Sequence, residues 1–252
     1  MVRQHQTRNL EIPGSMLCIA PEGLSRRRVH RSDRPTWKEQ TSVDTSVTRD
    51  LHYYEPAKGH GLRHDPFNAI IAPRPIGWIS SRDTRGNVNL APYSFFNGFN
   101  YVPPIIGFSS TSWKDSVVNI QETGEFVWNL ATRDLAQQMN ATAAHVARDV
   151  SEFAIAGLTA VPSRLVGVPR VAESPVSFEC KLTQIIQLQA ADGRKVQGWL
   201  TLGEVVAVHI DKSLIKDGVY QTALARPIVR AGRRGDYFEI RPDAMFEMAR
   251  PD

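Results

Sequence analysis

Residues 112–116, Ser-Trp-Lys-Asp-Ser, place a cation, a carboxylate and two hydroxyls between two apolar runs. Apolar residues at Trp113, Val117 and Ile120 have helical spacing and predict a short amphipathic helix over residues 112–122. In one interpretation, the first serine is the N-cap of this helix and the aspartate completes a capping box. In the other, the lysine, the nearby hydroxyls and the free N–H groups of the helix start bind a phosphate. These residues alone leave both interpretations open.

Other kinds of chemical site have weaker support in this sequence. It contains no G-x-x-x-x-G-K-[ST] nucleotide loop, no G-x-G-x-x-G motif and no G-x-S-x-G elbow. His52, His60 and His64 lie near one another, but their spacing matches no set of metal ligands, so we interpret them as surface histidines and expect no metal. A phosphate-bearing ligand would therefore have to be held by a fold other than a nucleotide-binding α/β domain.

The charge of the chain is concentrated near its start. The 252 residues carry a net charge of +4, of which residues 1–50 hold nine Lys/Arg against six Asp/Glu. We predict a disordered basic extension at 1–50 and a folded, nearly neutral domain at 51–252, without a nucleic-acid-binding face. No apolar run reaches the roughly 20 residues of a membrane span, and Cys18 and Cys180 suggest no disulfide. These features favour a cytoplasmic protein.

The elements that must position the candidate phosphate site are mostly strands. Short apolar runs alternate with turn residues, and the turn at residues 191–195, Ala-Asp-Gly-Arg-Lys, joins two long alternating runs. Strands are expected at 75–81, 88–96, 104–109, 125–130, 176–188 and 196–210, and a second helix at 134–144. This pattern predicts a mainly β (α+β) fold, an antiparallel barrel with peripheral helices.

Five segments in a fixed order resemble the flavin reductase-like family. They are APRPIGWISS at 72–81, GNVNLAPYSFFN at 86–97, Pro103-Pro104, Lys114-Asp115-Ser116 with Asn119-Ile120 following, and GEFVWNL at 124–130. Ser81 and Ser116 stand where this family usually has threonine, and both keep the hydroxyl. The resemblance covers residues 52–240 and implies an FMN-binding split β-barrel, a Greek-key-like antiparallel barrel.

The resemblance also implies roles for individual residues. Contacts to the flavin ring and ribityl chain are implied for Ser80, Ser81, Asn89, Ala91, Ser94 and Phe95, and contacts to the phosphate for Ser109, Lys114, Asp115 and Ser116. Later segments resemble the family at 175–180 and 203–209, with His209, Arg230 and Tyr237 as candidates for the substrate side. A structural role for His209 remains an alternative, and Cys180 is interpreted as a buried small residue.

The same resemblance implies an NAD(P)H-dependent flavin reductase that transfers hydride to flavin, with oxygen, a partner monooxygenase or another molecule as acceptor of the electrons. Its implied ligands are FMN, bound or diffusible, and small-molecule substrates, and its implied assembly is a homodimer. Two alternatives stay open: an FMN carrier or sensor without reductase activity, and an enzyme of different chemistry on the same scaffold. The sequence does not distinguish NADH from NADPH, nor does it identify the electron acceptor.

Overall fold

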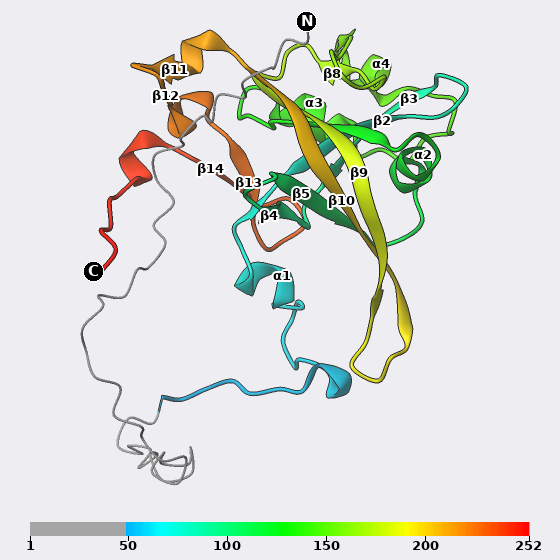
Figure 1. Ribbon diagram of the computed structural model, residues 1–252. Helices are drawn as coiled ribbons and strands as arrows, with labels where there is room; N and C mark the ends of the chain where they lie inside the picture. Colours follow the sequence, from blue (N-terminus) through cyan, green and yellow to red (C-terminus); the bar gives the residue numbers. More distant parts are fainter. Residues whose placement is uncertain (1–48, 252) are drawn as a thin grey trace, which may run out of the picture. The chain divides into compact units, whose positions relative to one another are not determined.

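A seven-stranded antiparallel sheet organises the structure, a computed structural model that describes residues 49–251 (Figure 1). The chain divides into two units after Tyr53, and everything below concerns the second unit. Along the sheet the strands are β3 (Val88–Tyr93), β2 (Gly77–Arg82), β6 (Glu125–Asn129), β9 (Val176–Gln189), β10 (Lys195–Ile210), β5 (Ile105–Ser110) and β4 (Phe96–Asn100). The predicted mainly β fold is confirmed. The extension predicted at 1–50 lies almost entirely outside the described residues.

The sheet closes on itself between its two edge strands. β3 and β4 lie at opposite edges, yet only two residues separate Tyr93 from Phe96, a path of at most about 11 Å. The two edges must therefore approach each other, and the linker between them is held to β5 by a 2.8 Å hydrogen bond from the Ser109 N–H to the Phe95 carbonyl. The predicted split barrel is confirmed. The single strand predicted at 88–96 is wrong, because the chain turns there and joins both edges.

The helices of the described residues are short. They are α1 (Phe67–Ile70), α2 (Asp115–Thr123), α3 (Ala136–Ala141) and α4 (Glu152–Ala156). The last three bury residues against the sheet, whereas no residue of α1 is buried. α2 buries Val117 and Ile120 completely, as their spacing predicts, and ends at Gly124, whose φ of 72° suits glycine. Among the described residues no helix is long and apolar enough to cross a membrane.

Pairs of short strands complete the structure. The pairs are β1 (Arg74–Pro75) with β13 (Ile228–Arg230), β13 with β14 (Tyr237–Glu239), β7 (Ala160–Val161) with β8 (Arg170–Val171), and β11 (Ile215–Lys216) with β12 (Val219–Tyr220). The predicted hairpin between β9 and β10 is present, with the Ala190 N–H bonded to the Arg194 carbonyl at 2.9 Å. Gly193 adopts a φ of 82° in this turn.

The two faces of the sheet have separate cores. Successive residues of a strand point to opposite faces. Ile79, Phe126 and Cys180 point into the barrel, where they pack with the apolar side of α2. Trp78 and Leu90 point outward and pack with residues of α3 and α4. Which face a side chain occupies therefore decides which site it can serve.

Candidate functional site

A cavity of about 440 Å³ lies at the β3 edge of the sheet, beside the start of α2. Its lining comprises Asn89, Ala91, Pro92 and Tyr93 of β3, Ser112–Ser116, the segment Thr142–Val146, and Glu152. Five residues predicted for the site, Asn89, Ala91, Lys114, Asp115 and Ser116, are thus brought together. We call this space the Lys114 cavity.

The start of α2 is open toward this cavity. The capping box predicted from Ser112 and Asp115 is wrong, because the helix begins at Asp115 with Lys114 in the N-cap position and no side chain caps it. The Lys114 carbonyl accepts from Val117 and Val118, so the helix is regular from its first turn. An uncapped helix start carries free N–H groups and positive partial charge, which favour an anion. Lys114 itself is exposed and adds a full positive charge.

Buried hydrogen bonds hold the polar side chains around this helix start. The Asn89 side-chain amide donates to Ser116 Oγ at 2.9 Å and to Ser81 Oγ at 3.4 Å. Asn119 also donates to Ser81 Oγ, at 3.2 Å, and accepts from Arg148 at 2.9 Å. Ser81 does not line the cavity, but it connects two residues of the network and so positions Asn89 and Ser116.

The Tyr93 hydroxyl is a buried polar atom without a hydrogen-bond partner of good geometry. Burial raises the pKa of Tyr93 to about 12, although the hydroxyls of Ser116 and Ser110 lie close enough to oppose the shift. The phenol therefore stays protonated at neutral pH and can donate a hydrogen bond. A buried donor that lacks an acceptor costs free energy unless a ligand supplies one.

Two charged residues that the sequence did not single out serve this region: Glu152 lines the cavity, and Arg148 lies outside its lining. Glu152 is buried, accepts from the Leu90 N–H at 3.0 Å, and has a pKa raised by burial and by the negative charge of Asp115. Arg148 connects the loop before α4 to α2, with ion pairs of 3.5 Å to Glu122 and 3.9 Å to Asp115. No motif identifies either residue in the sequence, because their roles depend on how the loop folds back.

Several predicted flavin contacts lie outside the lining of this cavity. Ser80 is fully buried and points to the outer face, where its hydroxyl donates to the Pro169 carbonyl at 2.7 Å. Ser94, Phe95 and Ser109 lie at the barrel closure, and the Arg74 guanidinium lies 5.4 Å from the Phe95 ring centroid. The barrel closure begins directly after Tyr93, so a ligand larger than the cavity could extend along it.

The three candidates for the substrate side are also outside the Lys114 cavity. The Arg230 guanidinium lies 4.6 Å from the Tyr237 ring centroid on the β13–β14 pair, and Tyr237 lines a separate cavity of about 540 Å³. His209 lies in a third cavity and bonds Glu179. Their substrate roles stay predictions. Cys180 is fully buried and its thiol pKa is raised by burial, as the structural interpretation requires.

Within residues 49–251, no group of three His, Cys, Asp or Glu side chains is arranged to hold a metal ion. The fold and the site together define a class of protein: an antiparallel split barrel with a polar cavity between an edge strand and an uncapped helix start.

The chain belongs to a known family of this class. Residues 71–227 match the flavin reductase like domain family. An uncharacterized protein of Halalkalibacterium halodurans is 34% identical over 180 residues, which cover 68% of this chain and 86% of that protein. Among solved structures, nitrilotriacetate monooxygenase component B from Bacillus cereus has a TM-score of 0.72 and 28% identity, and covers 80% of this chain and 100% of its own. The 2-nitrobenzoate 2-nitroreductase of Pseudomonas fluorescens has a TM-score of 0.65 and 28% identity, with coverage of 73% and 88%.

Proposed function

We propose that this protein binds FMN with its phosphate in the Lys114 cavity and transfers hydride from NAD(P)H to the flavin. The observation that carries the proposal is the uncapped start of α2, which opens into a cavity shared with Lys114, Ser116 and the unpartnered Tyr93 hydroxyl. These groups suit a phosphate because they combine positive charge with fixed hydrogen-bond donors. Family membership supplies the flavin as the bearer of that phosphate.

Each residue of the cavity has a definable role in this proposal. Lys114 and the first N–H groups of α2 would hold the phosphate, and Ser116, oriented by Asn89, would add a hydroxyl. Tyr93 would donate from its neutral phenol. Ala91 is small enough to let a flat ligand approach the main chain of β3. When bound, the flavin supplies the redox chemistry, so the protein needs to bind, orient and shield it rather than provide a strong acid or base.

Reduced flavin would pass to an acceptor, which we propose to be a partner monooxygenase. The support is the similarity to a protein described as a monooxygenase component B. We further propose a homodimer, because β3 and β4 approach each other without pairing and leave strand edges that a second subunit can cover. We also propose a cytoplasmic location.

The direct test is to mix the full chain with FMN and either NADH or NADPH without oxygen, and to follow loss of the flavin absorbance. Absorbance that falls with one nicotinamide establishes the reaction and its donor. Tight binding of FMN without nicotinamide-dependent bleaching would reject the reductase and leave a carrier or sensor.

The phosphate assignment has a test of its own. Lys114→Ala should weaken FMN binding by about tenfold or more, since a hydrogen bond to a charged group contributes roughly 1.5–3 kcal/mol. Riboflavin, which lacks the phosphate, should bind the variant and the wild type alike. Lys195→Ala, at the exposed end of the β9–β10 hairpin, is the matched control. Equal losses for FMN and riboflavin would reject Lys114 as a phosphate ligand.

A further inference from the structure

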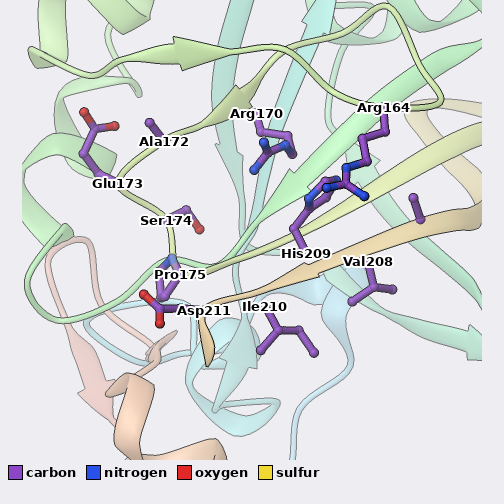
Figure 2. Close-up of a pocket in the computed structure, with 11 residues that line it drawn as sticks. Arg164, Arg170, Ala172, Glu173, Ser174, Pro175, Val208, His209, Ile210 and Asp211 are labelled. Atoms are coloured by element: carbon purple, nitrogen blue, oxygen red, sulfur yellow. The ribbon is translucent and has the colours of Figure 1, made fainter. Parts of the chain in front are cut away.

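A second polar cavity, of about 580 Å³, lies on the outer face of the sheet (Figure 2). It is bounded by the end of β10 and by residues 164–175, which cross over the sheet. Figure 2 shows Arg164 and Arg170 of this crossing segment and His209 of β10 around this space. None of its lining residues also lines the Lys114 cavity. We call it the His209 cavity.

A β-bulge directs His209 to this face. Val205 pairs with Cys180 and points into the barrel, so strict alternation would send residues 207 and 209 inward as well. The register shifts between Val205 and Ala207, and Ala207 pairs with Glu179 on the outer face. His209 follows on the same face, opposite Ser177. Bulges often redirect a side chain next to a functional site.

The fully buried carboxylate of Glu179 organises the cavity. It accepts from the backbone N–H groups of Arg164, Leu165 and Val166 at 2.8, 2.6 and 3.1 Å. His209 Nε2 lies 2.6 Å from Oε1 of this carboxylate, the oxygen that also accepts from Arg164. Burial opposes ionisation, but the hydrogen bonds from Arg164 and His209 outweigh it and lower the pKa of Glu179. One ionised group thus holds the His209 ring and the backbone that carries Arg164.

The two guanidinium groups of the cavity are not neutralised by the acids in its lining, Glu173 and Asp211. Glu173 accepts from the Thr159 N–H, and Asp211 caps the Ser213 N–H at 2.9 Å, so both carboxylates serve the backbone. Arg164 forms no ion pair with any residue in the described part of the chain. Arg170 donates to the Pro162 carbonyl at 3.3 Å, and its Nε atom is buried with no partner there.

We propose that the His209 cavity binds the phosphate or carboxylate group of a small molecule, held by Arg164, Arg170 and His209. Two guanidinium groups form strong, directional hydrogen bonds with such oxyanions. Glu179 is the positioning residue, since it orients His209 and the Arg164 segment. This second site does not depend on the proposed function, because it lies on the opposite face of the sheet from Ser81 and Asn89.

The experiment measures binding to the full chain by calorimetry, with adenosine 5′-monophosphate as a phosphate probe and succinate as a carboxylate probe. At least one probe should bind saturably at a site that Lys114→Ala leaves intact, and the tighter probe identifies the source of the oxyanion. The double variant Arg164→Gln/Arg170→Gln should lower that affinity by at least about tenfold. Arg194→Gln/Lys195→Gln, on the β9–β10 hairpin, removes the same charge and should bind as the wild type does.

A second measurement uses the wild-type chain, so its result does not depend on whether the double variants fold. Saturating probe should shift the ring ¹⁵N resonances of His209, assigned by their loss in His209→Gln, and added riboflavin should leave the shift in place. Failure of both probes to bind, equal binding by the two double variants, an unmoved His209 resonance, or displacement of the probe by riboflavin would each overturn the proposal.

Discussion

The two cavities use opposite faces of one sheet, and the sequence reveals them unequally. The Lys114 cavity draws most of its polar groups from three short segments, residues 89–93, 112–116 and 142–146. The His209 cavity brings together Arg164, Arg170 and His209, with Glu179 holding the first and the last of them, and no two of these residues are neighbours in sequence. The residues of the first site can therefore be found in the sequence as short motifs. The residues of the second site meet only after the bulge in β10 and the crossing segment 164–175 have formed.

The two proposals describe two ways to build an anion site. At the Lys114 cavity the positive charge comes from an uncapped helix start and an exposed lysine, with an unpartnered phenol beside them. At the His209 cavity it would come from Arg164, Arg170 and His209, and Glu179 holds the His209 ring and the backbone of Arg164. Side chains of the Lys114 cavity should therefore be replaceable at little cost to the fold, whereas the His209 cavity is coupled to the stability of the fold through Glu179.

The largest expected effect follows from that coupling. Glu179→Ala would leave three backbone N–H groups without an acceptor and should lower the free energy of unfolding by about 3 kcal/mol. Urea unfolding measures the change, with Glu247→Ala, an exposed position near the C-terminus, as the control. A loss no larger than that of the control would show that Glu179 does not hold the outer cavity together.

Ser80 and Ser81 are adjacent but point to opposite faces of the sheet, so substituting each one tests one face at a time. Ser81→Ala removes the hydroxyl that receives both Asn89 and Asn119, whereas Ser80→Ala removes the donor to the Pro169 carbonyl. Each change should cost about 1 kcal/mol of stability, but only Ser81→Ala should weaken FMN, by about fivefold. Unfolding and flavin titrations on the same samples test this. Equal flavin losses would remove the distinction between the faces.

These serines also show what the sequence could and could not predict. The order of motifs predicted the barrel and the convergence of Asn89, Lys114 and Ser116, since each motif is local and the family resemblance supplied their arrangement. It did not show that Ser80 and Ser81 point to opposite faces with different partners. Nor did it predict that Tyr93 ends one edge strand two residues before the other begins, because the break depends on barrel closure rather than on local propensity.

Glu152 and Arg148 were missed for another physical reason. A buried carboxylate and a cross-linking arginine look the same in sequence as solvated ones, and only the packing of the loop before α4 against β3 and α2 distinguishes them. The same holds for the His209–Glu179 pair, whose partners lie 30 residues apart.

A smaller effect is expected at the Lys114 cavity itself. Tyr93→Phe removes a buried hydroxyl with no partner, so the ligand-free protein should be as stable as the wild type or up to about 1 kcal/mol more stable. FMN binding should nevertheless weaken several-fold. A variant that loses stability without flavin present would show that the hydroxyl already has a partner in the free protein.

The pH dependence of Tyr93 sharpens that expectation. Because burial raises its pKa from 10.0 to about 12, the neutral phenol contributes its full stability below pH 10 and loses it as the pH approaches 12. The wild type should therefore lose stability relative to Tyr93→Phe across this range. Unfolding curves at pH 9 and pH 11.5 measure the difference, and parallel curves would contradict the raised pKa.

The smallest effect concerns the negative charge opposite the proposed phosphate. Glu152 has a raised pKa, so the folded state favours its protonated form, and its contribution to stability falls as the pH rises through that pKa. Glu152→Gln keeps an acceptor for the Leu90 N–H and removes both the buried charge and its repulsion of Asp115. It should raise stability at pH 7 by about 0.5–1 kcal/mol and strengthen FMN more than riboflavin. Glu204→Gln on β10 is the control, since this residue is only partly buried and does not line the Lys114 cavity. If Glu152→Gln weakened FMN instead, the carboxylate would be a ligand of the flavin, and the two anion sites would no longer differ only in how they gather positive charge.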